Sequence, residues 1–379
     1  MTNDKLYERY QRQIILPGFG ETGQRKLLKE KVLVIGAGGL GCPVLHYLTA
    51  AGVGTIGIVD DDVVALDNLH RQVLYSVKDI GLSKAQRAAH ILQQLNPSIK
   101  IIPFNERLTT QNTLMIFDEF DIIIDGTDNF STRYMINDAC VLLHKPFVYG
   151  AVSEFEGQVS VFNLPPNETG EAVNYRDLFP NPPKENEVLN CAEAGVLGVL
   201  PGIIGTMMAN ETIKIITGIG ITLTNQLQTY NALTNEFYKL NFFAKRETRS
   251  LIPKNEAEFL KTDYVWLCSS PVTSDEIDAD TFNSFIEKGN IDVIDVREPN
   301  EIPVVNEFSN INIPLAQLAD NSFRIKSDTV IAFCQTGNRS LQAAKILKGI
   351  FGGNKKIYSL RAGILGWRSG IKQYERKEA

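Results

Sequence analysis

The sequence is poor in cysteine, and its five cysteines are scattered without a CxxC pair. Closely paired thiols are typical of disulfide frameworks and zinc sites, so their absence fits a reducing compartment and gives no sign of zinc. Basic blocks are also missing from a chain with a net charge of −6, which argues against nucleic acid as a partner. The polar start, MTNDKLYERYQRQ, does not have the pattern of a signal peptide.

Long apolar runs are absent as well. The longest, AGVLGVLPGIIGTMMA, is interrupted by Gly and Pro and is shorter than a membrane span, so we expect a buried helix there. Together with the cysteine usage, this predicts a cytoplasmic protein without a membrane partner. A chain of 379 residues has room for roughly two or three domains of about 150 residues.

Strand and helix signals alternate over residues 31–163. KVLVIG, TIGIVD and DIIIDG are apolar, β-rich runs, and SKAQRAAHILQQLNP has helical spacing with Ser83 as a plausible N-cap. This alternation predicts an α/β fold with a Rossmann-like, doubly wound parallel sheet.

The pattern changes further along the chain. Residues 164–190 are polar and Pro-rich without periodicity, which indicates a functional or disordered loop, and a Gly-rich helix is expected over about 193–217. Periodicity lapses again before a second, smaller α/β alternation, which includes the strands IDVIDVR, TVIAFC and KIYSL. We therefore predict a first domain over 1–245, a linker over 246–275 and a second domain over 276–379.

A glycine-rich turn, GAGGLG, lies between the first predicted strand and a helix. It fits G-x-G-x-x-G, in which glycines let the backbone approach a phosphate at a helix N-terminus. Asp60 ends the next strand about 20 residues on, where such folds bind a ribose hydroxyl. By itself the motif indicates an adenine nucleotide, with NAD as the default, or a turn that binds no ligand.

Charged residues near this turn argue against NAD. Asn68 and Arg71 lie beyond the second strand, Lys84 opens the next helix, and Asp128 and Asn129 follow the strand DIIID. Each alone would be an ordinary surface group, but parallel strands bring their carboxyl ends to one edge of a sheet. Two cations and a carboxylate there suit a triphosphate with Mg²⁺ better than hydride chemistry.

A second candidate site follows the strand TVIAFC. In CQTGNR, four residues separate Cys334 from Arg339, and a helix follows. Cys334 could be a phosphatase nucleophile, a sulfur carrier or an ordinary buried thiol. A protein-phosphatase loop has one residue more, and the shorter ring suits a persulfide, whose anion the loop amides and Arg339 would stabilise. No paired His or general acid for ester cleavage is evident in the sequence.

Residues 5–243 resemble a known family. RYQRQIILPGFGETGQRKLLKEKVLVIGAGGLG, DDDVVALDNLHRQ, IGLSKAQ, DGTDNFSTRYMIND, EGQVSVF and CAEAGVLGVLPGIIG look like the ubiquitin-activating-enzyme-like adenylyltransferases that serve sulfur carriers. These are the molybdopterin-synthase adenylyltransferases and the ThiF proteins of thiamine synthesis. The resemblance implies that ATP adenylates the C-terminal glycine of a ubiquitin-fold sulfur carrier and that pyrophosphate is released.

The resemblance also implies residue roles. Asp60 would hold the ribose, Arg71 and Lys84 would meet the phosphates, and Asp128 would hold Mg²⁺. Arg12, otherwise an ordinary surface arginine, would reach the γ-phosphate from the other subunit of a homodimer. The implied nucleotide-binding set is Gly36, Gly38, Gly39, Gly41, Asp60, Asp62, Asn68, Arg71, Lys84, Asp128 and Asn129.

The chain departs from this family at its zinc site. Many members bind structural zinc through two CxxC pairs, but the first position here reads Asn174-Tyr175-Arg176-Asp177 and the second, near FFAKRETRS, has no cysteine. Without thiolates a tetrahedral zinc site is not supported, and no zinc is expected.

The remaining cysteines differ in their surroundings. Cys191 stands where relatives are often proposed to form a thioester or acyl persulfide with the carrier, and the alternative is a small buried thiol. Cys42 and Cys140 lie in apolar helical patterns that indicate core positions, and Cys268 lies in the predicted linker without a motif.

Residues 275–375 resemble a rhodanese domain. VIDVREPNE, INIPLAQL, the Cys334 loop and LRAGILGW carry the resemblance, with Asp295, Arg297 and Trp367 as marker residues. The lead-in EIPVVNEFSNINIPL departs from the usual pattern and puts donor access or partner docking in question. A catalytically idle, purely structural domain is the alternative.

Read together, the two loops predict one enzyme. The first domain would adenylate the carrier, and a persulfide sulfur donor would load Cys334, whose sulfur would displace AMP to leave a thiocarboxylate, directly or through Cys191. Fusion would give donor and acceptor a high effective concentration. The competing hypotheses are an NAD-dependent oxidoreductase with an appended domain and a scaffold that passes sulfur without adenylating. The choice between molybdopterin and thiamine pathways stays open.

Overall fold

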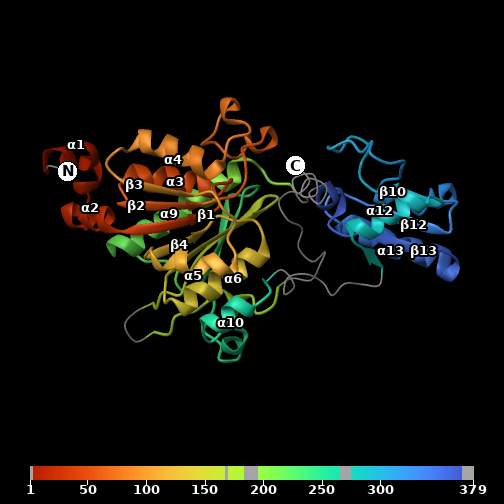
Figure 1. Ribbon diagram of the computed structural model, residues 1–379. Coiled ribbons are helices and arrows are strands. Elements are labelled where there is room, and N and C mark those ends of the chain that lie inside the picture. Colours follow the sequence, from red (N-terminus) through yellow and green to blue (C-terminus); the bar gives the residue numbers. More distant parts are fainter. Residues whose placement is uncertain (1–2, 167–169, 183–194, 265–274, 369–379) are drawn as a thin grey trace. The chain divides into compact units, whose positions relative to one another are not determined.

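The computed structural model describes residues 3–166, 170–182, 195–264 and 275–368 (Figure 1). They form two separately packed units, which divide between residues 264 and 275 of the described chain. Each unit is an α/β layer structure, so the predicted fold class is confirmed.

The sheet of the first unit has the strand order β3-β2-β1-β4-β5-β6-β7-β8. Its first five strands in sequence are parallel and the last three add on antiparallel. The bounds are β1 Lys31–Ile35, β2 Thr55–Val59, β3 Lys100–Phe104, β4 Ile122–Asp125, β5 Phe147–Ser153, β6 Glu156–Phe162, β7 Gln226–Asn231 and β8 Glu236–Asn241. The strand order reverses between β1 and β4, and such a switch point opens a crevice at the carboxyl ends of the strands.

Helices cover both faces of this sheet (Figure 1). Their bounds are α1 Asn3–Ile14, α2 Gly20–Lys29, α3 Gly41–Ala51, α4 Lys84–Leu95, α5 Thr110–Asp118, α6 Phe130–Leu142, α7 Tyr175–Leu178, α9 Val199–Thr217 and α10 Glu256–Lys261, with short 3₁₀ helices η1 Leu66–Asn68, η2 Val77–Asp79 and η3 Glu247–Leu251. The side chain of Ser83 accepts a hydrogen bond from the backbone N–H of Gln86, which confirms it as the N-cap of α4.

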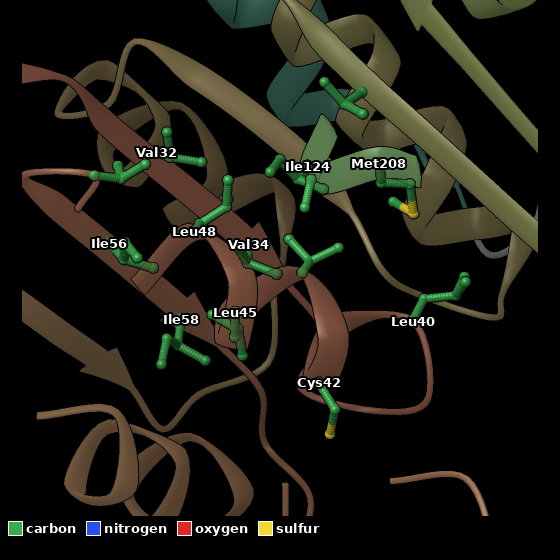
Figure 2. Packing of buried hydrophobic residues seen from close by; sticks show 14 of the residues in the cluster. Val32, Val34, Leu40, Cys42, Leu45, Leu48, Ile56, Ile58, Ile124 and Met208 are labelled. Carbon is green, nitrogen blue, oxygen red and sulfur yellow. The ribbon is translucent and has the colours of Figure 1, made fainter. Parts of the chain in front are cut away.

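Strand β1 shows why the parallel strands appear in the sequence as continuous apolar runs. Val32 and Val34 pack with Leu45 and Leu48 of α3 and Met208 of α9 (Figure 2). The alternate residues of β1 point to the opposite face and pack in the core cluster that contains α5 and α6. A parallel strand buried on both faces needs apolar side chains at every position, so it shows no alternation.

Short helices fill segments that the sequence pattern left irregular. Helix α7 lies inside the polar stretch 164–190, and η3 and α10 lie inside the predicted linker. Phe259 of α10 is fully buried and packs in the same cluster as α5 and α6, and Tyr264 is buried there too. The packing of the first unit therefore extends beyond residue 245. These helices have one or two turns, too few for a helical period to show in the sequence.

The second unit has an all-parallel sheet with the order β11-β10-β12-β13-β9. Its elements are β9 Glu276–Ile277, α12 Ala279–Lys288, β10 Ile291–Asp295, β11 Ile311–Asn312, η4 Leu315–Gln317, η5 Ser322–Arg324, β12 Thr329–Phe333, α13 Asn338–Phe351, η6 Gly352–Asn354 and β13 Lys356–Leu360. One face of β12 packs on α13, and the other packs on Phe282 of α12 and Trp367. Central strand β12 thus delivers Cys334 to the carboxyl edge of the sheet.

Among the helices that the structure describes, none combines the length and apolar character needed to cross a membrane.

Candidate functional site

The glycine-rich turn joins β1 to α3 in a conformation that only small residues allow. Gly36 has a φ of +88°, and a Cβ on Gly41 would lie 1.9 Å from the carbonyl oxygen of Gly36. Helix α3 begins at Gly41, so its first N–H groups face the crevice. A helix N-terminus reached through such a turn is suited to phosphate groups.

Asp60 ties the end of β2 to this turn. Its Oδ2 accepts a hydrogen bond from the N–H of Ala37 at 2.8 Å, and its Oδ1 accepts one from the N–H of Asp62 at 2.9 Å. Burial raises the pKa of the Asp60 carboxyl, while these bonds and the charge of Lys84 act in the opposite direction. Each carboxylate oxygen keeps a lone pair with which it can accept from a ribose hydroxyl.

Lys84 approaches the same place from inside the protein. Its side chain is 6% exposed, and its Nζ lies 3.0 Å from Oδ2 of Asp62, whose side chain is 72% exposed. An exposed carboxylate can turn into solvent at small cost, because exposed ion pairs are worth little. A phosphate group could therefore take the place of Asp62 beside the Lys84 ammonium.

The segment after β2 places Arg71 and Asn68 against the turn. The Cδ of Arg71 lies 3.6 Å from the position that a Cβ on Gly39 would take, so the stem of the arginine covers this glycine. Nη1 of Arg71 donates to the backbone oxygen of Asp67 at 3.1 Å. The amide oxygen of Asn68 accepts from Nε2 of Gln72 at 3.1 Å. The fold thus brings Arg71, together with its neighbour Asn68, to the glycine-rich turn of the same chain.

Gln72 lies beside the glycine-rich turn, although the sequence did not indicate it. It is buried, and its Nε2 lies 3.7 Å from the position of a Cβ on Gly38. Its Oε1 is buried without a hydrogen-bond partner among the described residues. An orphaned buried acceptor is costly, so the packing around Gln72 leaves one polar atom unsatisfied next to the turn. The sequence offered only one signal, the position of Gln72 directly after Arg71.

A buried ion pair fixes the loop that follows β4. Oδ2 of Asp125 accepts from Nε of Arg133 at 2.9 Å, and Oδ1 accepts from the N–H of Thr127 at 2.8 Å. Burial alone would lower the pKa of Arg133, but the facing Asp125 carboxylate raises it overall, so the guanidinium stays charged. No motif in the sequence singles out either residue of this pair.

Asp128 and Asn129, the two predicted site residues that follow β4, have different surroundings. Asp128 is exposed at the end of the fixed loop. The side chain of Asn129 is the N-cap of α6 and accepts from the N–H of Thr132 at 2.8 Å. Asn129 therefore holds the start of this helix, and Asp128 is the carboxylate that the loop presents at the strand ends.

Arg12 lies apart from these residues. It is exposed in the last turn of α1, and the neighbouring Tyr10 accepts a hydrogen bond through its hydroxyl from Nδ2 of Asn96, which precedes β3. Helix α1 is thus anchored at the amino edge of the sheet, opposite the crevice. Within a single chain the structure does not bring Arg12 to the nucleotide residues.

The cysteines predicted to be core residues are buried. Burial raises the pKa of Cys42 to about 12 and that of Cys140 well above its usual value, so both thiols are unreactive at neutral pH. Cys191 and Cys268 lie outside the described residues.

A polar cluster occupies the place where many resembling enzymes bind zinc. Oδ2 of Asp177 accepts from the backbone N–H of Asn174 at 2.9 Å, and Oδ1 accepts from the N–H of Lys245 at 3.0 Å and from the hydroxyl of Thr248. The carboxylate thereby joins α7 to η3, the two segments that paired thiolates would otherwise link. Within the described ranges, no group of His, Cys, Asp and Glu is arranged to hold a metal.

Replacing Asp177 by Ala should lower the free energy of unfolding of the first unit by about 3 kcal/mol, because it leaves several buried donors without an acceptor. Urea denaturation followed by circular dichroism measures this. The control is Asp118→Ala, an exposed residue at the end of α5, for which we expect a change within about 0.5 kcal/mol. Equal stabilities of the two variants would show that the cluster does not hold α7 to η3.

In the second unit, Cys334 directly follows β12 and is fully buried. Its Sγ accepts from the N–H of Gly337 at 3.1 Å, and the hydroxyl of Ser340 lies 3.7 Å from it. Gly337 has a φ of +107°, a conformation that L side chains rarely adopt, and it leads into α13. The loop therefore presents an N–H, a hydroxyl and a helix N-terminus to a sulfur anion.

Arg297 and Arg339 of the second unit are both paired with carboxylates. Nε and Nη2 of Arg297 donate to Asp295 at 2.9 and 2.6 Å. Arg339 donates through Nη1 and Nη2 to the two oxygens of Glu301 at 2.5 and 2.7 Å. Glu301 begins the lead-in that departs from the rhodanese pattern, so this segment contacts the Cys334 loop directly.

Comparisons with known proteins agree with this geometry. The sequence pattern of the ThiF family matches residues 10–251, and that of the rhodanese-like domain matches residues 278–370. The chain belongs to the ThiF family and carries a rhodanese-like domain after it. The resemblances deduced from the sequence are confirmed.

Relatives with the same combination cover nearly the whole chain. "Probable adenylyltransferase/sulfurtransferase MoeZ" of Mycobacterium tuberculosis is 40% identical over 374 residues, which cover 95% of this chain and 92% of that protein. "Adenylyltransferase and sulfurtransferase MOCS3" of Xenopus laevis is 34% identical, with 98% and 88% covered. "Sulfur carrier protein adenylyltransferase" of Thermus thermophilus is 50% identical over 239 residues, 63% of this chain and 88% of that protein. An NAD-dependent oxidoreductase is not favoured by these relatives.

Solved structures share the fold of the first unit. E. coli MccB with succinimide has a TM-score of 0.53 at 20% identity and covers 65% of this chain and 73% of that one. A structure of PaaA gives a TM-score of 0.53 with 65% and 76% covered. At this identity the likeness concerns the fold alone.

Proposed function

We propose that this protein uses ATP to adenylate the C-terminal glycine of a ubiquitin-fold sulfur carrier and then converts it to a thiocarboxylate with sulfur from Cys334. The observation that supports this most is the joint placement of the GAGGLG turn, Asp60, Arg71 and Lys84 at one sheet edge in a chain that also holds the Cys334 loop. Relatives named adenylyltransferase and sulfurtransferase carry the same two domains.

The adenylation step needs no protein nucleophile. A carboxylate oxygen of the carrier attacks the α-phosphorus, the bond to the pyrophosphate breaks, and negative charge grows on the leaving group. Arg71 and Lys84 would neutralise that charge, and Asp60 would hold the ribose. Positioning and charge neutralisation therefore do most of the catalysis.

Asp128 fits the part of a magnesium ligand. Mg²⁺ in such sites is held by one or two carboxylates together with substrate phosphates and water, so an exposed carboxylate at the strand ends suffices. Bound there, Mg²⁺ would neutralise charge on the phosphates. The buried Asp125–Arg133 pair would keep Asp128 in position by fixing its loop.

The sulfur step begins from a persulfide on Cys334. Its terminal sulfur attacks the carbonyl carbon of the acyl adenylate, AMP leaves, and an acyl disulfide forms. A thiolate then attacks the Cys334 sulfur, so that the S–S bond breaks and the thiocarboxylate is released. Either Cys191 or an external thiol could supply that thiolate.

A homodimer and a cytoplasmic location belong to the same proposal. Because Arg12 lies at the far edge of its own sheet, it could reach a γ-phosphate only in the crevice of another chain. The few scattered cysteines fit a reducing compartment.

The decisive experiment is ATP–pyrophosphate exchange with a panel of ubiquitin-fold carriers from molybdopterin and thiamine pathways. We expect exchange with at least one carrier and none with the same carrier lacking its terminal glycine. NAD binding without exchange would favour an oxidoreductase instead. Carrier binding without exchange would identify a scaffold that passes sulfur and does not adenylate.

A further inference from the structure

Two arginine–carboxylate pairs lie at the Cys334 loop. Arg297 pairs with Asp295, and Arg339 pairs with Glu301 through two hydrogen bonds. Glu301 also accepts from the backbone N–H of Glu298 at 2.8 Å, which fixes its carboxylate. The four charges of the two pairs sum to zero, so neither arginine contributes an uncompensated positive charge.

The Arg339 side chain, which follows the Cys334 loop, is paired with Glu301. The Cys334 sulfur accepts hydrogen bonds from the N–H of Gly337 and the hydroxyl of Ser340. Both terminal nitrogens of Arg339 donate to Glu301. The hydrogen bonds from Arg339 are the largest influence on Glu301 and lower its pKa, so the carboxylate stays ionised at neutral pH.

We propose that Glu301 determines the class of sulfur donor: by occupying Arg339, it disfavours the small inorganic dianion thiosulfate and leaves organic persulfides as the donors. This inference rests on the proposed sulfur transfer by Cys334. Glu301 acts through Arg339 and is a positioning residue.

The two donor classes differ in their leaving groups. With a persulfide R–S–SH, the Cys334 thiolate attacks the outer sulfur, the S–S bond of the donor breaks, and R–S⁻ leaves. With thiosulfate the same attack expels sulfite, which carries two negative charges. A cation beside the loop would attract and stabilise a dianion far more than a singly charged thiolate.

The test measures the loading of Cys334 in the full-length protein, as one added sulfur atom by mass spectrometry. The donors are thiosulfate and 2-hydroxyethyl persulfide, which carries charge only at its sulfur. Glu301→Gln should raise the second-order rate constant for thiosulfate by about tenfold or more and change that for the persulfide less than twofold. The gain should shrink at high salt, because the Arg339 side chain is one-third exposed.

Glu298→Gln is the matched control. It removes the same charge three residues away, keeps the backbone N–H that Glu301 uses, and should leave the ratio of the two rates unchanged. If Glu301→Gln does not fold, Glu301→Asp loosens the pair while keeping a charge, and a smaller shift toward thiosulfate is expected.

The outcomes separate the two proposals. Persulfide formation on Cys334 with an unchanged donor ratio in the folded Glu301 variant overturns the role of Glu301 alone. An equal rise for both donors would also overturn it, since that result indicates access to the loop and not charge. Failure of the wild-type protein to load sulfur from either donor would contradict the proposed sulfur transfer itself.

Discussion

Replacing Asp128 by Asn is expected to lower ATP–pyrophosphate exchange by about 10²- to 10³-fold, the range for losing one preorganised electrostatic contact. The substitution keeps the size of the side chain and removes the charge that would hold Mg²⁺. Asp128 is exposed, and its loop is held by the separate Asp125–Arg133 pair, so the fold should be retained. Carrier binding, measured by calorimetry, should stay within about twofold, because it needs no metal.

Asp121→Asn provides the comparison for this result. Asp121 is exposed at the opposite end of β4, where its carboxylate accepts from the N–H of Lys31 at 3.1 Å, a bond that an amide oxygen can keep. Exchange in this variant should match the wild type. Unchanged exchange in the Asp128 variant would remove Asp128 from the nucleotide site, and an equal loss in both would indicate a general effect of charge or stability.

Cys334→Ser should abolish the persulfide and lower thiocarboxylate formation below detection, while ATP–pyrophosphate exchange continues at the wild-type rate. The hydroxyl can keep the hydrogen bonds to Gly337 and Ser340, but at neutral pH it is not ionised and cannot attack a sulfane sulfur. Mass spectrometry of the donor-treated protein and of the carrier measures both products.

Cys140→Ala is the control for this variant. Burial keeps the Cys140 thiol protonated, so its removal should leave sulfur loading unchanged. A persulfide that survives in the Cys334 variant would show that another cysteine carries the sulfur. Loss of exchange together with loss of the persulfide would show that the two activities are not separable.

The sequence predicted the elements that have strong local signals. The glycine turn, the apolar strands around it and the helix after Ser83 follow from residue spacing, and the strand ends then place Asp60, Lys84 and Asp128 along one edge. The Cys334 loop was predictable for the same reason, since a strand, a glycine and a helix start are contiguous in the chain.

The remaining features depend on contacts between distant segments. Asp177 meets Thr248 across 71 positions, and Glu301 meets Arg339 across 38, so no local pattern announces either contact. Gln72 is distinguished only by its burial and its unsatisfied oxygen, which depend on how its segment packs on the turn. The role proposed for Arg12 depends on a second chain, because its proposed target lies in the crevice of the other subunit.

The Asp177 cluster affects how the connection between α7 and η3 depends on metal ions and on reactive sulfur. A zinc–thiolate clasp couples folding to the supply of free metal and offers nucleophilic sulfur to any persulfide nearby. A carboxylate that accepts hydrogen bonds from backbone N–H groups and a hydroxyl needs no metal and does not react with persulfides. In an enzyme that handles reactive sulfur, the joint between α7 and η3 is thus made by groups that a persulfide cannot attack.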